Sequence, residues 1–185
     1  MSNTEKLTKD FIEHFKSLSE PEQFKLGFLF NKETGGKLSP YNSPNPVSVA
    51  LIQIMVDNEI NLLGVRRGIP PKIGEVAFPG GFVDKLEDPL DTAVREVIEE
   101  TGFQTYAQDY ELMVAKPTPG NQVLLFYLNK NIYNKDIMKD MVVNSEVSEF
   151  ILINKDTPLA FPTHKNVLDD YFKQYQKTNN LKKSY

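Results

Sequence analysis

The chain has 185 residues, of which 40% are hydrophobic and 25% charged, and its formal net charge is −4. These values fit one folded globular domain, and the mild negative charge argues against a general nucleic-acid binder. The sequence has no cysteine, which excludes disulfides, thiolate metal sites and a cysteine nucleophile. The N-terminus lacks the basic start and apolar run of a signal peptide, and no segment reaches 18 uninterrupted apolar residues. We therefore expect a cytoplasmic protein with no membrane or nucleic-acid partner.

Periodicity and turn residues predict the elements in chain order. An amphipathic helix is expected over residues 7–18, and residues 32–46 form a loop rich in Gly, Pro, Ser and Asn. The β-branched run over residues 47–56 is typical of a strand buried on both faces, and residues 60–67 return as an antiparallel strand. The remaining predicted elements are a turn at Asp57-Asn58, a loop over 68–74, strands at 76–78, 110–115, 123–128 and 150–153, a turn at 118–121, and a helix from His164 to about Lys177 with Thr163 as N-cap. This alternation predicts a mixed α/β domain.

The segment from Gly80 to Phe103 contains a clearly delimited helix. Asp88 suits the N-cap, Pro89 the first helical position and Gly102 the position after the last turn. On an ideal helix the apolar side chains share one arc, and three carboxylates share another that lies roughly opposite. The apolar set is Leu90, Val94, Val97 and Ile98, and the acidic set is Glu96, Glu99 and Glu100.

Two explanations compete for these three carboxylates. They form either an ordinary solvated helix face or a binding site for a cation. Like charges three and four residues apart destabilise a helix by about 0.2–0.5 kcal/mol per pair, and anions are disfavoured near its C-terminus. Clustered carboxylate oxygens suit a hard divalent cation, so the sequence favours a site for Mg²⁺ or Mn²⁺.

The spacing of this segment resembles the box of the Nudix hydrolase family (MutT-like), G-x5-E-x7-R-E-U-x-E-E-x-G-U, where U is a bulky apolar residue. Every fixed position is present, and compatible features extend from about Val47 to about Phe172. The matching residues are Gly81, Glu87, Arg95, Glu96, Val97, Glu99, Glu100, Gly102 and Phe103. The resemblance implies an α/β/α sandwich around a mixed β-sheet, with the box as a loop-helix-loop.

The resemblance also implies an activity and its residues. Nudix enzymes cleave a diphosphate bond in a nucleoside diphosphate linked to another moiety. By resemblance the metal ligands are Glu96, Glu99, Glu100 and the main-chain carbonyl of Gly81. Glu87 would lie near the metal, and Arg95 would orient the glutamates by bidentate hydrogen bonds. Gly80 and Gly81 would let the backbone turn tightly beside the metal.

The general base differs between Nudix subfamilies, and the sequence leaves it open. It lies either within the box or on a later loop. Glu146 and Glu149 stand roughly where such a loop glutamate is often found, but they are equally well explained as exposed acids before a strand. We favour Glu99 or Glu100 over either of them.

The substrate is indicated only by weaker signals. Arg66 and Arg67 end a strand just before the box and could face substrate phosphates, although strand alternation puts only one on a given face. Pro119 lies 16 residues beyond the box in Thr-Pro-Gly, a placement similar to that in ADP-ribose pyrophosphatases. Against this, Leu-Leu-Gly-Val-Arg and Phe-Pro-Gly-Gly partly resemble the coenzyme A pyrophosphatase pattern. ADP-ribose or a related nucleotide sugar is the favoured small-molecule partner, and coenzyme A or an oxidised nucleoside triphosphate is the alternative.

Two non-catalytic readings remain as alternatives. One is a Nudix fold that binds a nucleotide without hydrolysing it, and the other is a purely structural acidic helix. We expect an N-terminal extension over residues 1–40 and a Nudix hydrolase domain over residues 41–185. Related pyrophosphatases often use such extensions in dimer contacts, which suggests a homodimer but leaves the oligomeric state open.

Overall fold

The computed structural model describes residues 13, 14, 17, 19, 22 and 44–182, with side chains up to Tyr175 at the end of that range. The chain divides into two compact units, Met1–Pro44 and Asn45–Tyr185, and the second carries the fold described below. Residues 13, 14 and 17 of the expected N-terminal helix are helical, whereas the rest of that helix, most of the extension over residues 1–40 and its role in a homodimer fall outside the described residues. The domain boundary near residue 41 stays a prediction.

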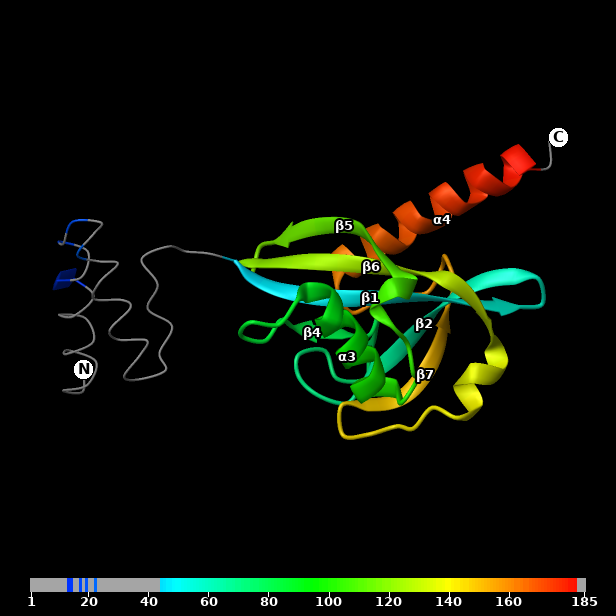
Figure 1. Ribbon diagram of the computed structural model, residues 1–185, viewed down its shortest axis with the longest axis horizontal. Helices are drawn as coiled ribbons and strands as arrows, with labels where there is room; N and C mark the ends of the chain where they lie inside the picture. The colour runs from blue at the N-terminus through cyan, green and yellow to red at the C-terminus, as the bar shows by residue number, and fades with distance from the viewer. Residues whose placement is uncertain (1–12, 15–16, 18, 20–21, 23–43, 183–185) are drawn as a thin grey trace. The chain divides into compact units, whose positions relative to one another are not determined.

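The second unit is built on one seven-stranded mixed sheet (Figure 1). The main strand order is β3-β2-β1-β6-β5, with β4 paired to β1 and β7 to β2. Strands β1 and β6 are parallel, and the other pairs are antiparallel. The strands are β1 Asn45–Val56, β2 Glu59–Arg67, β3 Val76–Ala77, β4 Gly80–Phe82, β5 Tyr110–Thr118, β6 Gln122–Asn134 and β7 Val147–Ile153; the helices are α3 Pro89–Thr101 and α4 Pro162–Lys182, with short 3₁₀ helices η1 Ala107–Asp109 and η2 Lys135–Lys139.

Two helices cover opposite faces of this sheet. Val167 and Leu168 of α4 pack with Val49 and Leu51 in one core cluster. The second cluster joins the α3 residues Ala93 and Val97 to Ala50, Ile52 and Ile54 of β1. Successive side chains of β1 thus enter different clusters, because side chains alternate across a strand. This confirms both the predicted strand buried on two faces and the predicted α/β/α sandwich.

The sheet opens where β1 and β2 separate. The two strands pair only near their hairpin, over Gln53–Val56 and Glu59–Leu62. Asp57 and Asn58 have φ of 48° and 64°, as a tight hairpin turn requires. Beyond the paired part, β4 takes the partner position on β1 and β3 takes it on β2. The fork between these strands leaves room for a cavity.

Several predicted boundaries are corrected. Strand β1 begins at Asn45 inside the predicted loop, and β6 continues to Asn134 because it pairs in parallel with β1. Strand β4 was not predicted: its two glycines have low strand propensity, and pairing with β1 decides its conformation. Helix α4 begins at Pro162, two residues before the expected start, in the first turn where proline is tolerated.

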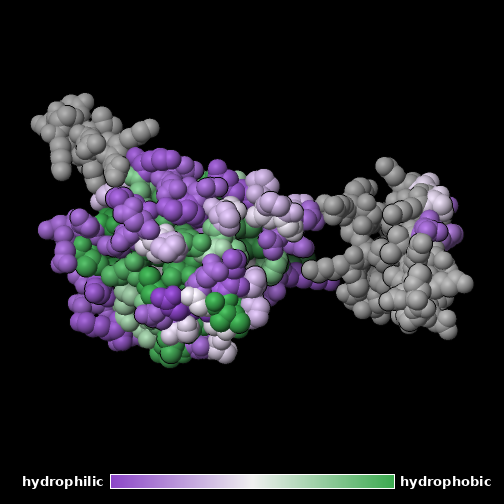
Figure 2. All heavy atoms as spheres, turned by 180° about the vertical axis from the view of Figure 1, so that it is seen from behind, coloured by the Kyte–Doolittle hydropathy of each residue, from purple (hydrophilic) through white to green (hydrophobic). Residues whose placement is uncertain are grey.

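The surface of this unit is mixed in polarity. Figure 2 shows an apolar area on one face, bordered by hydrophilic side chains. Phe82 and Leu86, in the segment that leads into α3, are among the large hydrophobic side chains that stay exposed. No helix in the described part of the chain is long and apolar enough to cross a membrane.

Candidate functional site

Helix α3 begins and ends at the residues that the sequence predicts. The Asp88 carboxylate accepts a hydrogen bond of 2.8 Å from the backbone N–H of Leu90, and Pro89 occupies the first turn. Gly102 adopts the left-handed conformation with φ of 73°, and its N–H donates to the carbonyl of Ile98 at 2.8 Å. Residues without a Cβ adopt this conformation at low cost, so both ends of the helix are fixed locally.

The predicted placement of the three glutamates on one outward face is wrong. Glu100 is only 8% exposed and lies on the buried side of α3 with Ala93 and Val97. Glu96 is half-buried, and only Glu99 is exposed. Helical periodicity did not predict the burial of Glu100, because this side of α3 borders a cavity as well as the core. A cavity wall, unlike a packed core, can contain carboxylates.

Arg95 connects the carboxylates of the box. Its Nε donates to Glu87 Oε1 at 2.8 Å and its Nη2 donates to Glu87 Oε2 at 3.1 Å, which makes a bidentate pair. Its Nη1 donates to Glu96 Oε1 and to Glu99 Oε2, each at 2.8 Å. Arg95, followed by the Thr92 hydroxyl, lowers the pKa of Glu87 to about 2. The guanidinium therefore holds three acidic side chains in fixed positions.

Two glycines bring the backbone of β4 against these carboxylates. The N–H of Gly80 donates to Glu100 Oε2 at 3.3 Å. A Cβ on Gly80 would overlap the carbonyl of Ser48 in β1, and a Cβ on Gly81 would overlap the Glu96 carboxylate. Only glycine fits this close approach of strand and helix.

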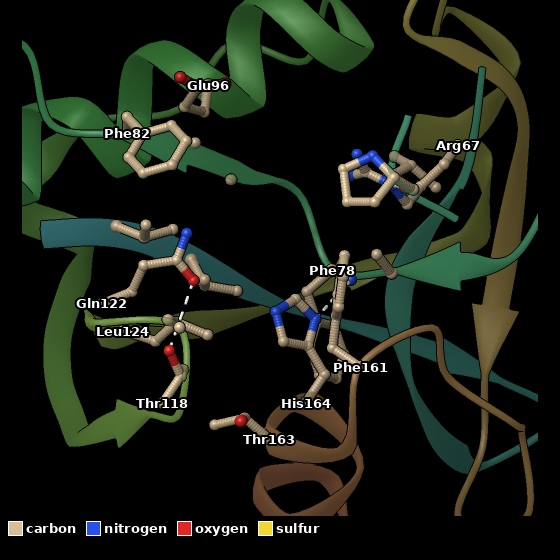
Figure 3. A pocket seen from close by; sticks show the side chains of 18 of the residues that line it. Arg67, Phe78, Phe82, Glu96, Thr118, Gln122, Leu124, Phe161, Thr163 and His164 are labelled. Carbon is tan, nitrogen blue, oxygen red and sulfur yellow. Dashed lines mark hydrogen bonds between the residues drawn. The ribbon is translucent and has the colours of Figure 1, made fainter. Parts of the chain in front are cut away.

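A cavity of about 710 Å³ lies beside these groups. Figure 3 shows Glu96 and Phe82 at one side, with Phe161 and His164 across the open space. Its lining residues are Val47, Val49, Val65, Arg67, Ile69, Pro70, Pro71, Ala77, Phe78, Gly80, Gly81, Phe82, Glu96, Glu100, Thr118, Pro119, Gly120, Gln122, Leu124, Glu146, Phe161, Pro162, Thr163 and His164. The cavity combines an acidic group of side chains with a mostly apolar and aromatic wall.

Burial and mutual repulsion make the acidic group electrostatically unfavourable as it stands. Burial raises the pKa of Glu100 to about 8; the charges of Glu96 and Glu146 add to this, while the Gly80 N–H and Arg67 act in the opposite sense. Burial also raises the pKa of Glu96. A cation bound between these carboxylates would relieve both effects.

The other predicted site residues divide into those that line the cavity and those that do not. Arg67 and Pro119 line the cavity, together with Gly80, Gly81 and Glu146. Arg66 does not, because its Nε pairs with Glu149 at 2.7 Å outside the cavity. Glu99 is also absent from the lining and is paired with Arg95.

Within the described residues, no group of three or more His, Cys, Asp or Glu side chains is arranged to hold a metal ion. Arg95 turns Glu99 away from the cavity, which leaves Glu96 and Glu100 of the predicted ligands on its wall. These two carboxylates, the adjoining backbone of Gly81 and the nearby Glu146 supply only oxygen donors. Such a donor set fits a hard divalent cation.

His164 is a cavity residue that the sequence did not single out. The prediction treated it as a residue at the start of the last helix, and α4 does begin two residues earlier. Its ring is 5% exposed and packs against Phe78, Phe126 and Phe161. No local pattern reveals this placement, because two of the surrounding rings, Phe78 and Phe126, come from distant segments.

Comparison with known proteins gives a consistent result. The sequence model of the NUDIX domain family matches residues 44–166 of this chain. A methanol dehydrogenase activator from Bacillus methanolicus is 28% identical over 126 residues, which cover 68% of this chain and 67% of the activator.

Solved structures with the same fold have low sequence identity. The NUDIX domain of Shewanella oneidensis NrtR in complex with ADP ribose superposes with a TM-score of 0.59 at 19% identity, covering 85% of this chain and 99% of that domain. A C. elegans Ap4A hydrolase superposes with a TM-score of 0.57 at 16% identity, covering 71% and 98%. A MutT/nudix family protein from Enterococcus faecalis gives 0.54 at 19% identity; the match covers 82% of this chain and 56% of that protein.

Proposed function

The chain belongs to the NUDIX family, and from this premise we propose that it hydrolyses the diphosphate bond of a nucleoside diphosphate derivative with the help of Mg²⁺ or Mn²⁺. ADP-ribose or a related nucleotide sugar is the proposed substrate. The observation that carries the proposal is the cavity whose wall includes Glu96, Glu100 and Glu146 as well as aromatic side chains. Such a cavity suits a ligand with an anionic diphosphate and an aromatic base.

In the proposed site, Glu96, Glu100 and the carbonyl of Gly81 would hold the cation, and Glu99 would lie beside them in its contact with Arg95. A bound divalent ion neutralises phosphate charge and lowers the pKa of a bound water. The raised pKa of Glu100 supports this role, because its carboxyl lacks a compensating positive charge in direct contact among the described residues. Arg95 and Glu87 keep the ligands in position through their mutual hydrogen bonds.

Glu146 is the proposed general base. It lines the cavity from the loop before β7 and lies close enough to raise the pKa of Glu100. Its carboxylate would take the proton from the attacking water. Glu149 is less suited to this role because it is paired with Arg66 outside the cavity. The box glutamates, favoured from the sequence, are assigned to cation binding instead.

Arg67 is the proposed phosphate contact. Its Nε donates to the carbonyl of Pro71 at 2.7 Å, and its guanidinium lies 5.4 Å from the ring centre of Phe161. These contacts hold the side chain at the cavity wall. A guanidinium placed this way can donate to phosphate oxygens.

The test is cleavage of the diphosphate bond, followed by chromatography of the nucleotide products, in a panel of ADP-ribose, NADH, coenzyme A, diadenosine polyphosphates and oxidised nucleoside triphosphates, each with and without Mg²⁺. We expect metal-dependent turnover of ADP-ribose and its loss in Glu100→Gln. The panel also separates ADP-ribose from the coenzyme A and triphosphate alternatives. Nucleotide binding without turnover of any member, unchanged by Glu100→Gln, would refute hydrolysis and leave a binding module.

A second candidate function is activation of an alcohol dehydrogenase. It is favoured by one observation, the 28% identity to a methanol dehydrogenase activator over two thirds of both chains. The measurement is the initial rate of a purified methanol dehydrogenase with and without this protein. A rate increase that Glu100→Gln abolishes would join this function to the hydrolytic site, and an unchanged rate would remove the candidate.

A further inference from the structure

His164 occupies a built site in the cavity wall. Its ring stacks on Phe78 at 5.5 Å between centres and meets the edge of Phe126 at 5.4 Å. Phe161 packs against it at 5.2 Å. With only 5% of its surface exposed, the imidazole is held in one orientation by these three rings.

One ring nitrogen of His164 is used inside the protein. The backbone N–H of Phe78 donates to Nδ1 at 3.4 Å. Nδ1 must therefore be the unprotonated nitrogen, which places the hydrogen of the neutral ring on Nε2. Burial, followed by the nearby charge of Arg67, lowers the pKa of His164 to about 3. The ring thus stays neutral and presents a fixed N–H donor.

The second nitrogen faces the cavity. Figure 3 shows it directed away from Phe78, toward the side of the open space that carries Gln122. Within the described part of the chain, no group accepts a hydrogen bond from Nε2. No fully buried side-chain nitrogen or oxygen lacks a partner there, so Nε2 must reach open space. An N–H that reaches the cavity is free to donate to a ligand bound there.

We propose that the Nε2–H of His164 recognises the nucleobase of the substrate by donating a hydrogen bond to an acceptor nitrogen of its ring. The inference rests on the proposed function, since it places a nucleotide in this cavity. The rings of Phe161 and Phe78 and the side chains of Val49 and Leu124 form the surrounding wall, which suits an aromatic base better than a sugar. The carboxylates of Glu96 and Glu100 repel the anionic phosphates of a ligand wherever no cation is bound. The base, rather than the phosphates, therefore lies against the aromatic wall.

The test uses AMP and its 1-deaza, 3-deaza and 7-deaza analogues, each of which lacks one ring nitrogen. Binding is measured by isothermal titration with Mg²⁺ present; AMP and its analogues contain no diphosphate bond, so no hydrolysis takes place. The wild-type protein should bind one of the three analogues about 3- to 10-fold more weakly than AMP, as expected for one lost hydrogen bond. The other two analogues should bind like AMP.

Two variants separate recognition from folding. In His164→Asn the side-chain oxygen can still accept from the Phe78 N–H, but the donor at the Nε2 position is lost. This variant should bind AMP about 3- to 10-fold more weakly and should not distinguish the discriminated analogue from AMP. His164→Gln keeps a donor near the Nε2 position and should retain the discrimination. Thermal unfolding by circular dichroism checks that both variants are folded.

The outcomes are distinct from those of the proposed function. Absence of AMP binding, equal binding of all analogues by the wild-type protein, or unchanged discrimination in folded His164→Asn overturns the inference. Hydrolysis of ADP-ribose, measured in parallel with Mg²⁺, can persist in each of these cases. Conversely, discrimination that depends on His164 without any hydrolysis supports the inference and refutes the proposed function.

Discussion

Replacing Glu100 by glutamine should stabilise the metal-free protein at neutral pH while it abolishes activity. Burial and the neighbouring carboxylates raise the pKa of Glu100 from 4.5 to about 8. Between these two values the folded protein binds more protons than the unfolded chain, so its stability falls as pH rises through this window. At pH 7.5 the shift corresponds to about 4 kcal/mol, and at pH 5 to about 1 kcal/mol.

We expect a net gain of about 2 kcal/mol for Glu100→Gln at pH 7.5, because cavity water screens part of the charge and the new amide hydrogens need acceptors. The glutamine oxygen can keep the hydrogen bond from Gly80. For a chain of this size the gain corresponds to a rise in melting temperature of about 4–8 °C. The assay is thermal unfolding in EDTA at pH 7.5 and at pH 5.

Glu111→Gln is the matched control, since Glu111 is an exposed carboxylate on β5. Its free energy of unfolding should stay within about 0.5 kcal/mol of the wild-type value at both pH values. Adding Mg²⁺ should raise the melting temperature of the wild-type protein and leave that of Glu100→Gln unchanged. A lower melting temperature of Glu100→Gln at pH 7.5, or a gap that does not narrow at pH 5, would refute the electrostatic reasoning.

Three further substitutions test separate parts of the site. Glu146→Gln should lower kcat for AMP release from ADP-ribose about 100-fold with little change in KM, and an effect on KM alone would contradict its role as base. Gly81→Ala should weaken Mn²⁺ binding about tenfold in isothermal titration, because its Cβ displaces the Glu96 carboxylate. Arg67→Met should raise KM about tenfold through a lost phosphate contact, and Arg66→Met, outside the cavity, should leave KM within about twofold.

Features set by neighbouring residues were predictable from the sequence. Asp88, Pro89 and Gly102 delimit α3 through hydrogen bonds within the same few residues. The β-branched run of β1 and the turn at Asp57 and Asn58 also depend on local conformational preference. The fixed spacing of the box also identified the family to which the chain belongs.

Features set by distant segments were not predictable. Helical periodicity cannot distinguish a helix face that packs against other side chains from a helix face that borders a cavity, so it did not predict the burial of Glu100. Strand alternation indicated that Arg66 and Arg67 differ, but only the pairing with β7 shows that Arg66 meets Glu149. The surroundings of His164 likewise exist only after β3, β6 and α4 have come together.

The two helices of the sandwich carry different ends of the cavity. Helix α3 supplies Glu96 and Glu100 from one face of the sheet, whereas α4 supplies His164 from the other. Their packed side chains belong to separate clusters on the two faces of β1. A substitution among the packed residues of α4 therefore acts through a different part of the core than a substitution in α3.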